Sequence, residues 1–333
     1  MPTHPHSRRD LLLGASALSL AAAETVLAQQ QPSSNGIPTR PLGKTGVRVS
    51  ILGLGGHHQG RPKDEKESFR LVHTAIDNGI TFMDNAWDYL NGHAEEVMGK
   101  ALAMDGYRKK AFLMTKVCDR DYAGAMKHLE DSLRRLQTDV IDLWQFHECN
   151  YYNDPEFLQE QGGLKAALEA KKQGKIRFIG FTGHKHPRIH RKMLALDFKF
   201  DACQMPINIL DHSFESFRHE VVPECVKKGV GVIGMKGCTG DGRILTENIA
   251  TVEECYRYFL SQPVSTQVVG LATIEHLNKA IEMARNFKPL SAEELKTLSA
   301  RTKNVAGDGR YERFKTTQAF DAGHHRKQHG FQA

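Results

Sequence analysis

The strongest constraint on the fold of this 333-residue chain is a regular alternation of apolar, strand-like runs with amphipathic helical segments. The helical patterns include residues 122–136, 156–173 and 213–228. Strands that alternate with helices form parallel βαβ units, and eight strands close a (β/α)8 TIM barrel. We therefore expect an α/β protein with a TIM barrel. The eight predicted strands are residues 51–55, 80–84, 111–116, 140–146, 176–181, 201–205, 230–235 and 266–270.

Shorter elements flank the predicted barrel at both ends. Residues 39–50 contain two strand-like runs around a Gly-Lys-Thr-Gly turn, which predicts an N-terminal β-hairpin. Ser291 and Glu294 have the spacing of a capping box and predict an extra C-terminal helix over residues 291–303.

The first 28 residues have the pattern of an export signal. Arg8 and Arg9 precede an apolar run that is too short for a membrane helix and ends at the small-residue site around Ala28. The paired arginines resemble a twin-arginine signal, whereas a secretory signal with chance arginines is the alternative. We expect the Tat export machinery as a partner, a periplasmic or otherwise exported location, and no stable membrane association after cleavage.

The expected organisation has four parts. A stretch rich in Gln, Pro and Ser follows the signal and is typical of a flexible linker. The residues after the last predicted helix have no periodicity, so we expect a frayed terminus there. The parts are a signal peptide over residues 1–28, a linker over 29–36, the barrel over 37–303 and a C-terminal tail over 304–333.

Composition narrows the class of ligand. The formal net charge of +6 includes the signal arginines and a basic tail, so it argues weakly for an anionic ligand and not for nucleic acid. The six cysteines contain no C-x-x-C pair, and their irregular spacing predicts neither a metal site nor a disulfide framework. Buried thiols are expected, although an exported protein could pair two of them.

Ionisable side chains follow three predicted strands at the point where each strand ends. Asp84 and then Tyr89 follow the second strand, Lys116 ends the third, and His147 follows the fourth. The carboxyl ends of parallel strands meet at one rim, where active sites collect. A single lysine or histidine at such a position is most often a solvated edge residue. Four such groups at one rim predict an active site.

The residues around these positions resemble the aldo-keto reductase family. The motif Asp84-x-Ala86-x-x-Tyr89 is similar to the best-known signature of that family, and a lysine after the third strand and a histidine after the fourth complete its tetrad. The likeness extends from the hairpin to about Arg285. It implies hydride transfer between NAD(P)H and an aldehyde, ketone or sugar. It also implies a cofactor that lies across the barrel mouth without a Rossmann fingerprint.

The chemistry of carbonyl reduction explains why these four residue types occur together. Hydride addition produces an alkoxide, which is costly in a dry pocket unless a proton arrives with it. Tyr89 is the natural donor, and we expect Lys116 to lower its pKa while Asp84 keeps Lys116 charged. His147 can orient the carbonyl oxygen. The resemblance implies the same roles, with Tyr89 as general acid in reduction and general base in oxidation.

Departures from the family pattern fall at cofactor positions. Thr182 stands where the family commonly has the serine of a Ser-Asn pair, and Met235 replaces an aromatic residue that stacks on nicotinamide. Lys236 is either a phosphate contact or a solvated loop lysine. His276 stands where an arginine often holds the 2′-phosphate, so we expect NADP with NAD as the alternative. The resemblance assigns to cofactor binding Gly56, Asp84, Thr182, Gln204, Met235, Lys236, Gly270 and His276.

Two other functions stay open from the sequence. His57 and His58 follow the first strand and, with His147, could begin the metal site of a metal-dependent barrel hydrolase. That function would leave Lys116 and Tyr89 without a role, and His57 is otherwise a cofactor or substrate contact. The second alternative is a barrel that binds nicotinamide without catalysis.

Overall fold

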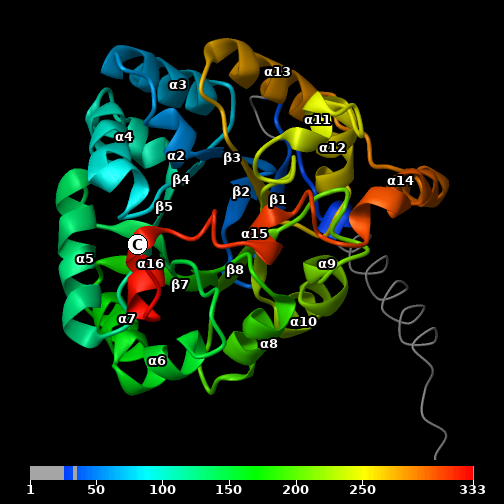
Figure 1. Cartoon of the computed structure of the whole chain (residues 1–333). Coiled ribbons are helices and arrows are strands. Elements are labelled where there is room, and N and C mark those ends of the chain that lie inside the picture. The colour runs from blue at the N-terminus through cyan, green and yellow to red at the C-terminus, as the bar shows by residue number, and fades with distance from the viewer. Residues whose placement is uncertain (1–25, 33–35, 333) are drawn as a thin grey trace, which may run out of the picture.

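The computed structural model describes residues 26–32 and 36–332. Its centre is a closed barrel of parallel strands in the order β10-β3-β4-β5-β6-β7-β8-β9, surrounded by helices (Figure 1). This confirms the predicted TIM barrel. Its strands are β3 (Leu52–Gly55), β4 (Phe82–Asp84), β5 (Phe112–Val117), β6 (Ile141–Phe146), β7 (Ile176–Thr182), β8 (Ala202–Pro206), β9 (Gly231–Met235) and β10 (Thr266–Val269).

The predicted hairpin precedes the barrel. β1 (Thr39–Pro41) and β2 (Arg48–Ser50) pair antiparallel. The buried side chain of Arg40 donates hydrogen bonds to backbone carbonyls just before β10. Two residues of the predicted linker also contact the hairpin, because Gln31 bridges to β1 and Gln30 Oε1 accepts a hydrogen bond of 2.9 Å from Arg40.

The hairpin closes one end of the barrel. Leu42 and Val49 are fully buried and belong to a cluster inside the barrel with Phe82 and Phe112, which are the first residues of β4 and β5. The rings of Phe82 and Phe112 stack with a centroid separation of 5.4 Å. Because apolar side chains fill the amino-terminal end, the carboxyl ends of the strands are left for polar groups.

Helices surround the strands, and two of the predicted helices are divided. The pattern over 156–173 breaks because Gly162 has a φ of 95°, a left-handed conformation that suits glycine. The pattern over 213–228 breaks at Val221, which places Pro223 in the first turn of a new helix, where its missing N–H does no harm. The helices around the barrel are α2 (Gly56–Gln59), α3 (Glu65–Asp77), α4 (His93–Ala103), α5 (Tyr122–Arg135), α6 (Asp154–Glu160), α7 (Gly163–Lys172), α8 (Pro187–Ala195), α9 (Phe217–Glu220), α10 (Val222–Lys228), α11 (Arg243–Thr246), α12 (Val252–Leu260) and α13 (Ile274–Arg285).

The C-terminal segment is folded onto the barrel, so the expectation of a frayed terminus is wrong. The extra helix α14 (Ala292–Ala306) begins directly after Ser291 with the predicted capping box. Beyond it, α15 (Arg313–Thr316) and α16 (Gly323–Gln328) cross the carboxyl end of the barrel, and Figure 1 shows them in red in front of the strands.

A buried ion cluster fixes this tail to the barrel. Lys315 is fully buried, and its Nζ lies 2.8 Å from Asp211 Oδ1 and 3.0 Å from Glu312 Oε2. The same nitrogen donates a hydrogen bond of 2.7 Å to the carbonyl of Phe214. Burial opposes the charge of Lys315, but the two carboxylates outweigh that effect and raise its pKa. The lysine therefore stays charged beside both acids, and burial raises the pKa of Glu312 to about 7.

We expect Lys315→Met to destabilise the protein by about 3–5 kcal/mol, because it leaves buried carboxylates without their cation. Urea unfolding followed by circular dichroism measures this loss. Lys303→Met, at an exposed position of α14, is the matched control and should change stability by no more than about 0.5 kcal/mol. Equal stability of the two variants would contradict the role given to the cluster.

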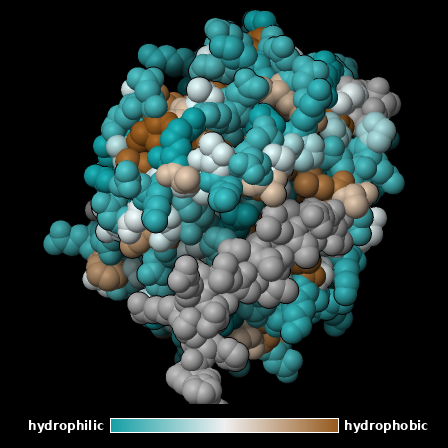
Figure 2. Space-filling view, turned by 90° about the vertical axis from the view of Figure 1, so that its right-hand side faces the viewer, coloured by the Kyte–Doolittle hydropathy of each residue, from teal (hydrophilic) through white to brown (hydrophobic). Residues whose placement is uncertain are grey.

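The outer surface is largely polar where the figures show it. In Figure 2 the side of the molecule that carries α14 is mostly hydrophilic, with apolar residues scattered over it. Within residues 26–32 and 36–332, no helix has the length and apolar character needed to cross a membrane. Residues 1–25 of the predicted signal and 33–35 of the predicted linker lie outside the described residues.

Candidate active site

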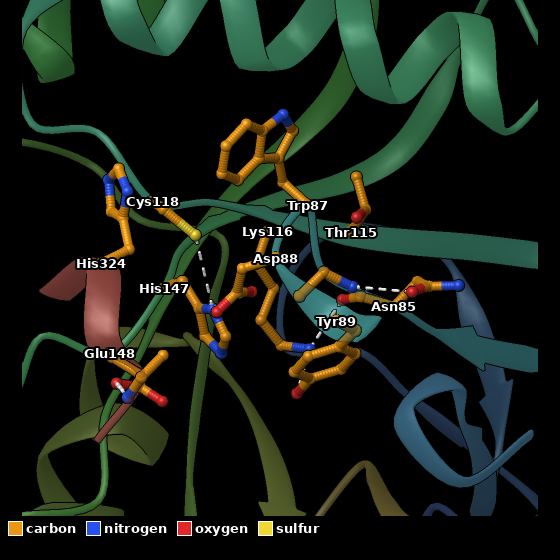
Figure 3. A network of polar contacts seen from close by, with 12 residues as sticks. Asn85, Trp87, Asp88, Tyr89, Thr115, Lys116, Cys118, His147, Glu148 and His324 are labelled. Carbon is orange, nitrogen blue, oxygen red and sulfur yellow. Dashed lines mark hydrogen bonds and ion pairs between the residues drawn. The ribbon is translucent and has the colours of Figure 1, made fainter. Parts of the chain in front are cut away.

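The structure brings the four predicted catalytic residues together at the carboxyl ends of adjacent strands. Asp84 ends β4, Lys116 lies near the end of β5, His147 follows β6, and Tyr89 begins the 3-10 helix η1 (Tyr89–Gly92). Lys116 Nζ lies 2.6 Å from Asp84 Oδ1 and 3.1 Å from the hydroxyl of Tyr89. Figure 3 shows Lys116 reaching toward Tyr89.

The ammonium group of Lys116 is held in one place. It also donates a hydrogen bond of 2.7 Å to the backbone carbonyl of Asn85, and its side chain is only 1% exposed. Three acceptors therefore surround Nζ. Because one of them is the phenolic oxygen, the arrangement places a fixed positive charge beside the group that would donate a proton.

The phenol of Tyr89 does not have the lowered pKa that the sequence suggested. Burial raises the pKa of Tyr89 well above its usual value, and the carboxylates of Asp84 and Asp88 add to that effect. The expectation of a lowered pKa is wrong because burial and the charges of Asp84 and Asp88 outweigh the effect of Lys116. Tyr89 is therefore protonated at neutral pH, as a proton donor must be.

Two histidine rings contact the ring of Tyr89 edge to face. The centroids of His57 and His147 each lie 5.4 Å from that of Tyr89. Burial lowers the pKa of His57 to about 4, so this imidazole is neutral at physiological pH. His57 therefore borders the phenol of Tyr89, and its predicted contact with a cofactor or substrate stays a prediction.

Asp88 is a site residue that the sequence reasoning missed. Its Oδ1 lies 3.0 Å from His147 Nδ1, and Figure 3 shows the two side chains next to each other. Burial would raise the pKa of Asp88, but the neighbouring His147 outweighs it and holds that pKa well below its usual range. Asp88 is therefore ionised and orients His147. The available signal was its position directly before Tyr89.

The C-terminal tail covers the rim beside these residues. Glu148 follows His147 with a left-handed φ of 45°, and its carboxylate accepts a hydrogen bond of 2.9 Å from the backbone N–H of Ala322. Burial raises the pKa of Glu148 to about 8. Asp321 Oδ1 lies 3.0 Å from His184 Nε2 and its Oδ2 lies 2.9 Å from Lys185 Nζ. These contacts fasten the tail directly to the loops that carry the site.

Two of the predicted cofactor residues lie next to each other at this rim. Thr182 and Gln204 are partners in the register of β7 and β8, so their side chains are neighbours. Gln204 Oε1 accepts a hydrogen bond of 3.0 Å from Gln145, whereas its NH₂ group has no hydrogen bond within the described part of the chain. A hydroxyl and an amide N–H pair in this position fit the carboxamide of a nicotinamide ring.

The remaining predicted cofactor residues are distributed around the rim. A Cβ on Gly56 would lie 2.4 Å from the carbonyl of Asp84, and one on Gly270 would lie 2.4 Å from His58 Nδ1, so neither position has room for a side chain. Met235 ends β9, half-buried. His276 is exposed in the first turn of α13.

Lys236 is not the solvated loop lysine that one interpretation gave, and its contact with a phosphate stays a prediction. It has a φ of 54°, and its Nζ lies 5.5 Å from the ring centre of Phe314 and 5.2 Å from that of Phe320. Both rings belong to the tail. Lys236 is therefore partly covered by aromatic side chains rather than solvated in an open loop.

The metal site of a hydrolase is not assembled. His57 and His58 lie edge to face with each other, and His58 packs against Gly270. Within the described ranges, the closely spaced group of metal-ligating atoms around His147 includes neither of them. The hydrolase alternative is not favoured. All six cysteines lie within the described residues and form no disulfide.

Comparison with protein families gives one match over most of the barrel. The model of the aldo/keto reductase family matches residues 51–249. Among curated proteins, the uncharacterized oxidoreductase YrpG of Bacillus subtilis is 32% identical over 241 residues, which cover 63% of this chain and 70% of that protein. For four further curated relatives, the matched share of their own length lies between 45% and 65%.

Solved structures show the same fold. The holo form of the aldo-keto reductase AKR11C1 from Bacillus halodurans is 26% identical with a TM-score of 0.69, covering 82% of this chain and 99% of that one. An aldo/keto reductase from Klebsiella pneumoniae, in complex with NADP and acetate, is 22% identical with a TM-score of 0.64, covering 79% and 94%. The second of these likenesses supports the fold alone.

Proposed function

The chain belongs to the aldo/keto reductase family of oxidoreductases, and from this premise we propose that it transfers a hydride between NAD(P)H and an aldehyde, ketone or sugar. The observation that supports this most directly is the position of Lys116 Nζ, 2.6 Å from Asp84 and 3.1 Å from the hydroxyl of Tyr89. A fixed cation beside a partly buried phenol supports proton transfer to a nascent alkoxide.

In this proposal the protein supplies the proton and the bound nicotinamide supplies the hydride. Tyr89, protonated at neutral pH, gives its proton to the carbonyl oxygen as negative charge develops there. Lys116 stabilises the phenolate that is left, and Asp84 keeps Lys116 in place. In oxidation the same phenolate accepts the proton of the alcohol. Asp88 holds His147 where its ring can orient the carbonyl oxygen.

The residues that would hold the cofactor are those of the rim. Thr182 and Gln204 fit the nicotinamide carboxamide, whereas Gly56 and Gly270 are packed against Asp84 and His58 and would contribute backbone groups only. The first turn of α13, capped by Thr273, offers free N–H groups to a phosphate.

The function is tested with NADPH and a panel of aldehydes, ketones and sugars, by following nicotinamide absorbance and product together. We expect equal amounts of NADPH oxidised and alcohol formed with at least one of these compounds. Tight NADPH binding without turnover on the whole panel would favour the non-catalytic alternative. Hydrolysis of an ester or amide without nicotinamide would contradict the proposal.

We expect only a modest preference for NADP over NAD, because His276 lacks the planar fork with which arginine holds a 2′-phosphate. Fluorescence titration with both cofactors measures the ratio of their dissociation constants. His276→Ala should bring that ratio closer to one. An unchanged ratio in the variant would show that His276 does not contact the phosphate.

We also propose that the twin-arginine-type signal exports the folded protein with its cofactor already bound. The periplasm has no nicotinamide pool, so a cofactor that dissociated readily would leave the protein idle. Mature protein from the periplasmic fraction should therefore release close to one nicotinamide dinucleotide per chain on denaturation. Protein that is found only in the cytoplasm, or that arrives empty and binds the cofactor weakly, would rule out this part of the proposal.

A further inference from the structure

Three side chains of metal-ligating type lie around His147 and form a group of four with it. Asp88 Oδ1 lies 3.0 Å and Cys118 Sγ 3.8 Å from His147 Nδ1. The ring of His325, from α16, packs at 88° against that of His147 with a centroid separation of 5.3 Å. One potential ligand atom from each of the four residues lies within 4.8 Å of the others. The roles that the family resemblance gives to His147 and Tyr89 do not explain why these four side chains lie together.

His325 is the member that ordinary packing explains least. Its side chain is 0% exposed, and neither ring nitrogen has a hydrogen-bond partner within residues 26–32 and 36–332. A buried polar group without a partner costs about 1–3 kcal/mol. The same ring is placed beside a carboxylate, a thiol and a second imidazole. An imidazole in such surroundings has the position of a metal ligand.

The residues around His325 fix its position in α16. Gln328 Nε2 donates a hydrogen bond of 3.0 Å to the carbonyl of Cys118. His324 Nε2 lies 2.7 Å from Asp119 Oδ1, and His329 Nε2 lies 3.2 Å from Asp154 Oδ1. These contacts lie on both sides of His325 along the chain. The last helix is therefore docked in a way that directs this imidazole toward the other three groups.

Arg120 fixes the backbone of two residues of this group, Cys118 and His147. This buried guanidinium donates hydrogen bonds of 2.9 Å to the carbonyl of Cys118 and 2.7 Å to that of His147. It forms an ion pair of 2.8 Å with Asp154. Because one rigid side chain holds the backbone of two of the four residues, their side chains have little freedom to separate.

We propose that Asp88, Cys118, His147 and His325 bind one divalent transition-metal ion, and that Zn²⁺ is the ion this set fits best. Bonds of about 2.0–2.3 Å to a tetrahedral zinc ion place the ligand atoms roughly 3.3–3.8 Å apart. The separations of 3.0 and 3.8 Å already approach that size, and the remaining ones, which are at most 4.8 Å, would shorten as the ion binds. Thiolate with imidazole is a ligand combination that suits zinc.

The site has the character of a structural site. Four protein ligands fill the coordination shell and leave no position for a substrate or a water. Binding forms four metal–ligand bonds and releases the thiol proton of Cys118, with no oxidation or reduction. The ion would join the last helix to His147 and so fix the tail over the active site. This inference does not depend on the proposed reaction.

Direct metal titration tests the site. The full chain is dialysed against a chelator and titrated with ZnCl₂ in competition with a chromophoric zinc chelator. We expect one equivalent to bind tightly, and both Cys118→Ser and His325→Ala to weaken binding by at least about tenfold. The matched controls are Cys238→Ser, at a partly buried thiol, and His93→Ala, at an exposed imidazole, and both should bind as the wild type does. Equal affinity in all five proteins would overturn the proposal.

Cobalt gives a readout that needs no variant. Co²⁺ in the wild type should show a thiolate-to-metal charge-transfer band and the intense visible bands of tetrahedral coordination, neither of which an octahedral surface ion produces. The charge-transfer band should disappear in Cys118→Ser and persist in Cys238→Ser. A spectrum without thiolate or tetrahedral features, or no stoichiometric uptake after prolonged dialysis, would refute the assignment.

Discussion

Tyr89→Phe should lower the rate of NADPH-dependent carbonyl reduction by about a hundredfold or more, because it removes the hydroxyl that lies 3.1 Å from Lys116 Nζ and would deliver the proton. General acid catalysis by a positioned side chain contributes typically 10²–10⁴-fold. The substitution changes little volume, and the ammonium group of Lys116 keeps its contacts with Asp84 and Asn85. The dissociation constant for NADPH should therefore change little.

Single-turnover kinetics with a carbonyl substrate and fluorescence titration with NADPH separate these two effects. Tyr152→Phe is the matched control, because Tyr152 is 52% exposed, and it should leave both quantities unchanged. Turnover by Tyr89→Phe at a rate comparable to the wild type would remove Tyr89 from the role of general acid. A loss of NADPH affinity with unchanged single-turnover rate would assign Tyr89 to binding instead.

Lys116→Met should lower the rate of carbonyl reduction to a similar degree, and the reason is electrostatic. The phenolate that forms during proton transfer would lose the cation 3.1 Å away, while burial and the carboxylates of Asp84 and Asp88 continue to oppose its charge. The substitution also leaves Asp84 buried without a partner, so we expect a loss of about 3–5 kcal/mol in the free energy of unfolding.

The combined variant Asp84→Asn/Lys116→Met removes both charges and should recover part of the stability but none of the activity. Urea unfolding and single-turnover rates of both variants test this separation. Lys127→Met is the control, since Lys127 is 70% exposed and pairs with Asp131 on the outer surface. Full activity in Lys116→Met would show that Tyr89 needs no cation.

The barrel could be predicted because each of its strands is an apolar run and the runs alternate with helical patterns. The places where helices break were harder to predict. Residues 156–173 have apolar spacing that suits one helix, and only the left-handed φ of Gly162 shows that the chain turns there. A glycine is tolerated within a helical pattern, so its presence alone does not identify a break.

The sequence could predict those residues of the candidate site that lie at the ends of strands. The tetrad residues do so, and the barrel brings them together. His325 has no such marker, because it lies in a segment without periodicity and is buried only through contacts made by its neighbours in α16. The direction of the pKa shift of Tyr89 could not be predicted from the sequence either. It depends on the sum of burial and several charges rather than on one lysine.

All eight barrel strands precede α16 in the chain, and the polar contacts that this helix and its C-cap His329 make with the barrel go to the segments that follow β5 and β6. The rim that carries the tetrad is therefore built entirely by residues that lie earlier in the sequence than the helix that covers it. Loss of α16 would leave the strands and their hydrogen bonds in place and would uncover the side of His147 that faces Asp88 and Cys118.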